Sequence, residues 1–520
     1  MLQRGQVRAK TPAIQALTAA AAEERAAASL GQIVTHTAPI TSDSNQIDGR
    51  TQRLLEAPVL PLLLQMAAPN VLIMVAQAST GLIETWWVAK LGTAALAGMA
   101  LVFPAVMLMS MISAGAMGGG IASAVAQALG GARRHDADSL VLHAAVINIV
   151  LGAAFSVIFL LFGKPLYQLL GGEGAELEAA LIYSNVVFAG NIFIWLMNGL
   201  ASVIRGTGNM LYPAIVTCSG VIFLVPFSPL LIFGFGPIPA MGIAGGGTAL
   251  VVFYVAGTGA MAWYILAGKC AVRLRWAGLR GITIASIMRV GAISAFTSIQ
   301  TNVTIAGATA LVASVGGVGS VAGFGTGVRL DYLLVPLIFG LGSPLVVMVA
   351  TNMGAGQPQR ALTMAITGGA VAFALTETIG LVAAIWPEQW LRLFSSEPDM
   401  IETGSAYLRI VGPTYGFFGL GLALYSVAQG AGRPLWPFAG GVLRITIALG
   451  GGGGRLANDR LARRAFWCPR PGVGYLWADN ADCRAIRGMV SVIGAALLFN
   501  VVPASCQTCS GGRSILGERT

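Results

Sequence analysis

Three acidic residues lie inside long runs of apolar residues: Glu84, Asp331 and Glu377. An ionised carboxylate surrounded by hydrocarbon is energetically costly, so such a residue usually faces a cavity or a partner. A carboxyl group in a partly dry cavity can exchange a proton, and in its ionised form it can bind a cation. We therefore predict that these three residues bind a coupling ion, with structural pairing of buried acids as the alternative.

Uncharged polar residues cluster in two of the apolar segments. Such side chains can line a cavity between two halves of a protein, or they can form hydrogen bonds between neighbouring helices. Both interpretations stay open for each residue. The candidates for a cavity lining are Gln65, Asn70, Gln77 and Thr85 in the first segment, and Gln300 and Asn302 in the seventh.

Other kinds of chemistry have little support in the sequence. No G-x-x-x-x-G-K-[ST] phosphate loop occurs, which argues against transport driven by ATP bound to this chain. The three histidines lack metal-ligand spacing, and the single C-x-x-C at 506–509 is a weak zinc signal. No catalytic constellation is visible, so we expect no enzyme activity, no cofactor and no metal site.

The elements that must position these residues are long apolar helices. Of the 520 residues, 56% are hydrophobic and 10% are charged, whereas soluble domains have about 25% charged residues. A helix of about 20 apolar residues crosses a bilayer core. Eleven such segments occur, at 65–89, 93–117, 139–163, 181–204, 211–233, 241–267, 287–313, 327–350, 361–386, 405–428 and 435–450.

The charge distribution predicts an orientation. If the N-terminus is cytoplasmic, the loops after even-numbered segments hold nine basic residues and the opposite loops hold three. This asymmetry obeys the positive-inside rule, and it accounts for the net charge of +10 without a nucleic-acid partner. We expect a multi-pass protein of the inner (plasma) membrane.

An internal repeat relates the two halves of the chain. VAQALGGA at 125–132 matches VATNMGAG at 349–356, and SVIRGTGNMLYP at 202–213 matches SVAQGAGRPLWP at 426–437, with the same offset in both matches. Six segments separate the matched points, so the two copies have the same orientation. Parallel six-helix repeats are typical of transporters. The predicted fold is therefore an all-α polytopic membrane protein with two six-helix lobes.

The repeat requires twelve helices, yet only eleven are clear. After five consecutive glycines at 450–454 the chain becomes rich in arginine, tryptophan and cysteine, where the symmetry calls for a twelfth span. A frameshift in the G-rich codons would explain this, and a genuine soluble tail is the alternative. We divide the chain into a cytoplasmic extension, partly helical or disordered (1–57), an N-lobe with its basic linker (58–285), a C-lobe (286–450) and an aberrant tail (451–520).

Several stretches resemble the multidrug and toxic compound extrusion (MATE) family. They are GLIETWWVAKLGTAALAGMAL, QALGGARRHDA, SVIRGTGN and RLDYLLVPLIFGLGSPLVVMVATNMGAGQPQRA, and the likeness covers about residues 58 to 450. The resemblance implies twelve helices around a central cleft that alternately faces each side of the membrane. It also implies that a proton or sodium ion enters while an organic, often cationic, compound leaves.

The family pattern bears on the acidic residues one by one. Family members usually carry an acid-threonine pair in the first helix, and Glu84-Thr85 occupies that place with glutamate instead of aspartate. Arg329 and Asp331 meet the arginine-x-acid opening of the eighth helix, whereas Glu377 matches no family motif. The resemblance thus implies an ion-coupled antiporter, with small organic substrates and membrane lipids as partners, acting as a monomer. A lipid or oligosaccharide flippase and a non-functional frameshifted copy are the alternatives.

Overall fold

The computed structural model describes residues 48–446, apart from 238, 276–277, 279–280, 316–317 and 395. Side chains are also left out at 282, 305–315, 318–322, 328, 331–333 and 444. The chain divides into Met1–Gln46 and Ile47–Thr520, and the description below concerns the second unit. The predicted frameshift and the tail at 451–520 lie outside the described residues, as does most of the N-terminal extension.

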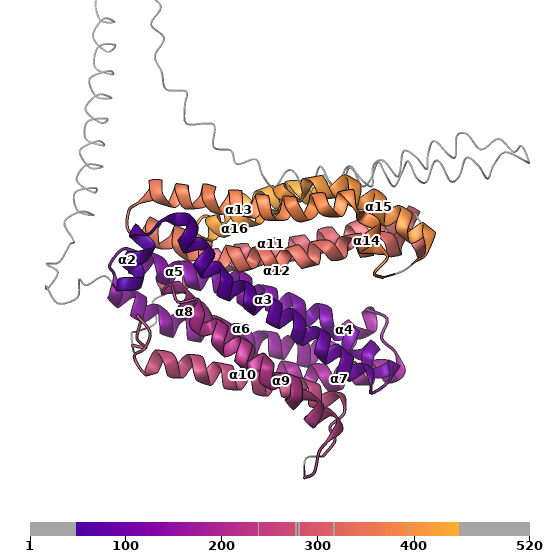
Figure 1. Cartoon of the computed structure of the whole chain (residues 1–520). Helices are drawn as coiled ribbons and strands as arrows, with labels where there is room; N and C mark the ends of the chain where they lie inside the picture. Colours follow the sequence, from indigo (N-terminus) through magenta and orange to yellow (C-terminus); the bar gives the residue numbers. More distant parts are fainter. Residues whose placement is uncertain are drawn as a thin grey trace, which may run out of the picture. The chain divides into compact units, whose positions relative to one another are not determined.

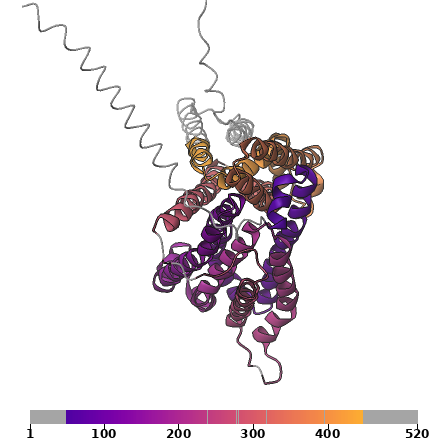
Figure 2. The ribbon, with the colours of Figure 1, turned by 90° about the vertical axis from the view of Figure 1, so that its left-hand side faces the viewer.

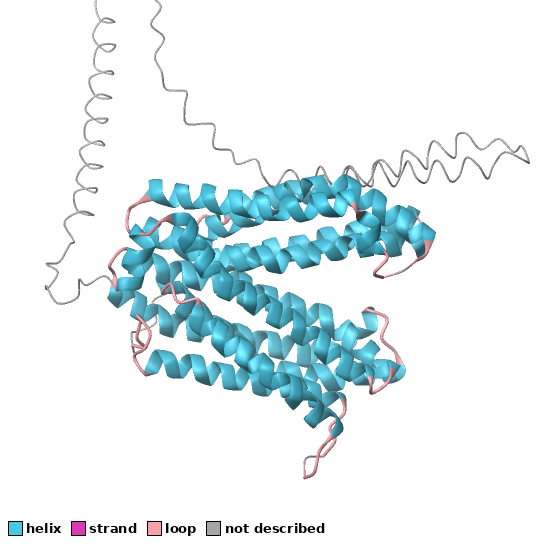
Figure 3. Cartoon of the chain, in the orientation of Figure 1, coloured by secondary structure: helices cyan, strands magenta, loops and turns pink. Residues whose placement is uncertain are grey.

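Helices make up both halves, and the described residues contain no β-strand (Figure 3). The first half consists of α2 (Gly49–Glu56), α3 (Val59–Ala89), α4 (Thr93–Ser110), the π-helix η1 (Met111–Met117), α5 (Gly118–Gly130), α6 (Arg134–Leu169), α7 (Gly174–Ala189), α8 (Asn191–Gly206), α9 (Leu211–Phe233) and α10 (Ile243–Leu266). The second half consists of α11 (Gly281–Val315), α12 (Val318–Gly354), α13 (Pro358–Ile385), α14 (Pro387–Leu391), α15 (Pro398–Val411), the 3-10 turn η2 (Gly412–Thr414), α16 (Tyr415–Gly430) and α17 (Leu435–Ile445).

All eleven predicted segments overlap these helices, and three of them, 93–117, 181–204 and 405–428, extend over more than one helix. Eight described helical stretches are long and apolar enough to cross a membrane, and the bent pair α7–α8 makes a ninth. The chain is thus a multi-pass membrane protein. Several basic residues that the charge analysis assigned to loops lie within helices, for example Arg205 in α8, and α2 is a helix at the end of the N-terminal extension.

Two spans are broken at corresponding places in the two halves. The axis turns by 48° between α7 and α8, next to Gly190. In the second half, η2 interrupts the span between α15 and α16 at Gly412–Thr414. Pro413 lies in this turn, and proline removes a backbone donor that a continuous helix needs. The broken spans are therefore α7–α8 and α15–η2–α16.

Close glycine contacts confirm the parallel repeat at the level of single residues. A Cβ atom on Gly206 would lie 2.9 Å from the carbonyl oxygen of Ala122, and one on Gly430 would lie 2.6 Å from that of Val346. The offset from Gly206 to Gly430 equals the offset from Ala122 to Val346, and it is the offset of the sequence repeat. The α5–α8 packing of the N-lobe thus recurs as the α12–α16 packing of the C-lobe.

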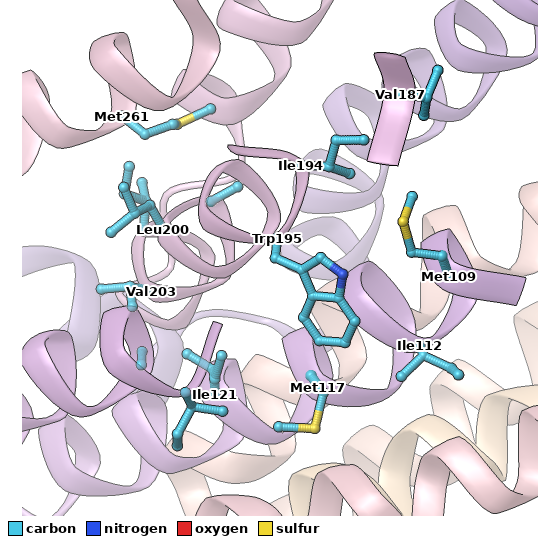
Figure 4. Packing of buried hydrophobic residues seen from close by; sticks show 14 of the residues in the cluster. Met109, Ile112, Met117, Ile121, Val187, Ile194, Trp195, Leu200, Val203 and Met261 are labelled. Carbon is cyan, nitrogen blue, oxygen red and sulfur yellow. The ribbon is translucent and has the colours of Figure 1, made fainter. Parts of the chain in front are cut away.

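Each lobe has its own apolar core. In the N-lobe the fully buried Trp195 lies among Met109, Ile112, Met117 and Ile194 (Figure 4). A second buried cluster belongs to the C-lobe and includes Phe324, Leu334, Tyr407 and Tyr415. Many large apolar side chains are exposed on the outside of the helices, for example Leu82 and Ile222. Such a surface suits lipid contact.

The lobes meet most closely at one end, where α5 crosses α12. Figures 1 and 2 show α3–α10 and α11–α17 as two groups of helices. A Cβ atom on Gly130 would overlap the carbonyl oxygen of Thr351, and one on Gly354 would overlap that of Gln127. The side chain of Gln127 also donates a 2.8 Å hydrogen bond to the carbonyl oxygen of Gly430. We call this end, which also carries α2, the closed end.

Candidate ion-coupling and transport site

Glu84 is a buried carboxyl group within α3. Only 5% of the residue is exposed, and its Oε1 atom has no hydrogen-bond partner among the described residues. Neither of the two ion pairs found in the described part of the chain involves it. A buried acceptor without a partner is costly and usually marks a functional feature or an unseen ion or water. Glu84 therefore has the environment of a group that binds a proton or a small cation.

Two tyrosines share the surroundings of Glu84. In its ionised form, the carboxylate would interact electrostatically with the hydroxyl groups of Tyr183 on α7 and Tyr254 on α10. Tyr183 is buried, and all three residues belong to the N-lobe. The Glu84 site is thus enclosed by one lobe and does not lie between the two. The sequence analysis identified neither Tyr183 nor Tyr254 as a site residue.

A stripe of polar residues on α3 leads to Glu84. Asn70, Gln77 and Glu84 are seven residues apart, which places them along one side of a helix. Asn70 is buried and donates hydrogen bonds to the carbonyl oxygens of Phe339 (3.3 Å) and Gly340 (3.0 Å) on α12. Gln77 is exposed. The stripe therefore runs from a contact between the lobes, through an exposed amide, to the buried carboxyl group.

The other two candidates on α3 form hydrogen bonds, one within α3 and one with α2. The hydroxyl group of Thr85 donates a 2.7 Å hydrogen bond to the carbonyl oxygen of Gly81 in its own helix, and the residue is exposed. Gln65 is also exposed and accepts a 2.7 Å hydrogen bond from Arg53 on α2. The structure thus places Gln65 at the closed end, away from the Glu84 end of the helix.

The two candidates on α11 face different neighbours. The side chain of Asn302 donates to the carbonyl oxygen of Ser298 (2.9 Å) and contacts the Met111 sulfur of the N-lobe (3.7 Å). Gln300 is buried against Gly441 of α17, and its Oε1 atom lacks a partner among the described residues. Asn302 therefore lies between the lobes, whereas Gln300 lies inside the C-lobe.

Glu377 occupies a different setting on α13. Its Oε2 atom accepts a 2.7 Å hydrogen bond from the backbone N–H of Gly416, in the first turn of α16. The free N–H groups at a helix start favour a negative charge. Glu377 thus caps α16 at the break in its span. Asp331 lies on α12, and its side chain is outside the described set. Glu84 and Glu377 belong to different lobes and form no common site.

A polar cluster between the lobes escaped the sequence analysis. The buried Gln429 of α16 donates hydrogen bonds to Ser294 Oγ on α11 (3.0 Å) and to the hydroxyl group of Tyr425 (3.0 Å). It also contacts the carbonyl oxygen of Gly115 in η1 of the other lobe (3.5 Å). The repeat could have indicated this position, because a polar residue, Arg205, stands at the corresponding place in the first copy. Among the described residues, no group of His, Cys, Asp and Glu could hold a metal ion.

Comparison with known proteins gives consistent results. The MatE family model matches residues 69–230 and 294–449, one stretch in each lobe. The chain is 26% identical over 407 residues to the FAD transporter of Shewanella oneidensis, covering 76% of this chain and 88% of that protein. It is 27% identical over 387 residues to the probable multidrug resistance protein NorM of Deinococcus radiodurans, covering 71% and 80%.

Solved structures share the fold. One is an outward-facing conformation of a multidrug resistance MATE family transporter of the MOP superfamily, with a TM-score of 0.75 and 19% identity over 88% of this chain and 96% of that one. Another is a MOP superfamily transporter from Pyrococcus furiosus with a binding pocket of reverse polarity, with a TM-score of 0.75 and 18% identity over the same shares.

Proposed function

Because the chain belongs to the MATE family of efflux transporters, we propose that it is an ion-coupled antiporter that exports organic, often cationic, compounds by alternating access. The observation that carries this proposal is the Glu84 carboxyl group, which is buried in an apolar span with one oxygen atom lacking a partner among the described residues. Such a group gains most from binding a proton or a sodium ion. The relatives called multidrug resistance proteins support the substrate class.

The coupling follows from linkage between two binding events. An ion that binds more tightly to one arrangement of the lobes shifts the population toward it, and a substrate that prefers the other arrangement is then released. Asn70 bonds to α12 of the opposite lobe and lies on the same stripe of α3 as Glu84. A change at Glu84 thus acts on a helix that contacts both lobes. Asp331 is a second candidate for ion coupling, and Glu377 ranks third, because its carboxyl group already accepts a hydrogen bond at the start of α16.

The polar residues between the lobes are candidates for substrate contacts. Asn302 reaches η1 of the N-lobe, and Gln77 is exposed on α3. The proposed orientation has a cytoplasmic N-terminus in the inner membrane, which places the basic loops inside. The closed end is then cytoplasmic, and the arrangement described here faces outward. We propose that the protein acts as a monomer without a resident cofactor.

Vesicle transport tests the role of Glu84. Purified protein is reconstituted into liposomes, and efflux of a fluorescent organic cation is driven by a proton gradient or by a sodium gradient. Coupling free energies between two sites usually correspond to about 5- to 150-fold. We expect Glu84→Gln to reduce gradient-driven transport within that range and Glu84→Asp to keep most of it. Ser79→Ala is the matched control, because in the described part of the chain the Ser79 hydroxyl group bonds only to Val75 of the same helix.

The outcomes answer two separate questions: which ion is coupled to transport, and whether Glu84 binds it. A response to only one gradient identifies the ion. Full gradient-driven transport by Glu84→Gln would show that the carboxyl group is not the coupling site.

A dinucleotide is the second candidate substrate. The Shewanella oneidensis relative, which the chain matches over 88% of its length, is a FAD transporter. The same vesicles loaded with FAD report this activity through flavin fluorescence. Export of FAD without export of organic cations would replace the proposed substrate class while leaving the ion-coupling test unchanged.

A further inference from the structure

The short helix α2 touches both lobes at the closed end. It is amphipathic: Thr51 and Leu54 are buried, whereas Gln52 and Glu56 are exposed. Leu54 belongs to an apolar cluster with Ala126 of α5 and Met348 of α12. The apolar side of α2 therefore sits where α5 of the N-lobe faces α12 of the C-lobe.

Polar contacts fix α2 to the C-lobe. The Asn352 side chain on α12 donates a 3.2 Å hydrogen bond to the carbonyl oxygen of Leu54. Arg360 on α13 donates a hydrogen bond from its guanidinium group to the carbonyl oxygen of Ala57, the residue that ends α2. These two carbonyl groups lie at the end of α2, where a helix leaves acceptors unsatisfied. The C-lobe thus supplies the hydrogen-bond donors for the carbonyl groups at the C-terminal end of α2.

Other contacts fix α2 to the N-lobe. Arg53 donates a 2.7 Å hydrogen bond to the side chain of Gln65 on α3. On another side, a Cβ atom on Gly208, in the turn after α8, would lie 3.0 Å from Leu54 Cδ1. Alternating access requires the lobes to separate at whichever end is closed. Such a separation cannot preserve the contacts of α2 with both α5 and α12.

We propose that α2 is a latch that holds the closed end shut. Leu54 anchors this helix by apolar packing, and Asn352 and Arg360 of the C-lobe hold it by hydrogen bonds. This proposal rests on the alternating access described under the proposed function. In each cycle the latch leaves the C-lobe before that end opens. Weakening the latch therefore shifts the population toward the arrangement that is open at the α2 end.

A distance measurement between spin labels tests the latch without any transport. Labels on His135→Cys and Gln359→Cys mark the exposed starts of α6 and α13, one in each lobe at the closed end. Cys218 and the four cysteines after residue 460 are replaced by serine. Cys270 lies outside the spans, and burial raises the pKa of its thiol, so it reacts slowly with the label. Double electron-electron resonance then gives the distance distribution in detergent and in nanodiscs.

The variants are Leu54→Ala and Asn352→Ala, with Gln52→Ala as the control. Gln52 lies on the same helix, but it is exposed, and among the described residues its side chain bonds only to Glu56 of α2. We expect both latch variants to raise the ratio of the long-distance to the short-distance population by about tenfold, since loss of a buried side chain readily shifts a two-state equilibrium by that much. The control keeps the distribution of the parent protein.

The readouts distinguish failure of the latch from failure of the fold or of the proposed function. Leu54→Met keeps the apolar volume and restores the parent distribution, which separates loss of the anchor from misfolding. An unchanged distance distribution in both Leu54→Ala and Asn352→Ala overturns the proposal. A shifted distribution supports it even if neither a proton nor a sodium gradient drives transport, because the measurement reports only lobe separation.

Discussion

Glu84 and Glu377 both carry a carboxyl group inside an apolar helix, but their surroundings indicate different roles. Glu84 is buried with an oxygen atom that has no partner among the described residues. Glu377 is half-buried and bonds to the backbone N–H of Gly416 at the start of α16. A helix start inside a membrane has free N–H groups that need an acceptor. Residue type alone predicts an unusual site in both cases, and only the neighbours tell the two roles apart.

The capping role of Glu377 makes a prediction that differs from ion coupling. Glutamine keeps an acceptor oxygen at this position, so we expect Glu377→Gln to fold and transport nearly as the parent does. Loss of a helix cap costs about 0.5–2 kcal/mol, so Glu377→Ala should lower the temperature of thermal unfolding. Thr378→Ala is the control, since the side chain of that exposed residue bonds only within α13 among the residues that the structure describes. If Glu377→Gln abolishes the response to an ion gradient, Glu377 is a coupling residue instead.

The candidate site could be predicted from the sequence only in part. Hydropathy located Glu84, Asn70 and Gln77 on one span, because charged and amide groups stand out in an apolar run. The partners could not be predicted, since Tyr254 and Gly340 reach α3 only through the tertiary fold. Gln65 illustrates the limit: its residue type fits a cavity lining, but in the structure it binds Arg53 of α2.

At the scale of elements, the crossing of α5 and α12 depends on glycine. Gly130 and Gly354 are related by the repeat, and at each of them a side chain would overlap a backbone carbonyl group of the other lobe. Backbone-to-backbone approach of this kind needs small residues, as is common where membrane helices pack. The closed end is therefore built from two matching helix contacts.

This crossing predicts a contrast between two glycine substitutions. Gly130→Ala forces α5 and α12 apart, and overpacking of this kind costs about 1–3 kcal/mol. In Gly259→Ala, on α10, the new methyl group meets no atom within 4 Å, and a glycine-to-alanine change in a helix is favourable by roughly 0.5–1 kcal/mol. Thermal unfolding in detergent should therefore show a lower midpoint for the first variant and an equal or higher one for the second. Equal midpoints for both variants would contradict the close crossing.

The spans themselves were the most predictable elements. Length and hydropathy placed all eleven segments on helices, and the prediction of 211–233 coincides with α9. The internal irregularities were not predicted, because they leave hydropathy unchanged. The π-helix η1 joins α4 to α5 without a polar residue other than Ser113, and at the bend a Cβ atom on Gly190 would overlap the Val251 side chain of α10.

At the scale of the whole molecule, the internal repeat predicted more of the structure than any other feature of the sequence. The constant offset between the two copies in the sequence reappears as equivalent contacts, such as Gly118 with Ser202 and Gly342 with Ser426. The placement of one lobe against the other was not predictable, because a sequence repeat does not show which residues meet between the two copies. The Asn302 contact with Met111 and the position of α2 are examples.

The repeat also makes the last prediction, which concerns the end of the C-lobe. In the N-lobe, α10 packs closely on its neighbours, for example through Gly257 against Met197 and Phe253 against Gly220. The positions that the repeat pairs with α10 are 467–490, which lie outside the described residues and have no apolar run of that length. A six-helix lobe without this span would leave apolar surface uncovered. A base lost or gained in the codons for Gly450–Gly454 would account for the difference.

Resequencing the codons for Gly450–Gly454 tests the reading frame directly. Expressing the protein in both reading frames tests how the frame affects stability and transport. We expect a version with the alternative frame after Gly454 to unfold at a higher temperature and to transport several times faster than the chain printed here. Recoding the five glycine codons without changing the frame is the control, because it alters only the nucleotide tract. If the printed frame is verified and both versions transport equally well, residues 451–520 are a genuine tail and the C-lobe functions without a twelfth span of the α10 type.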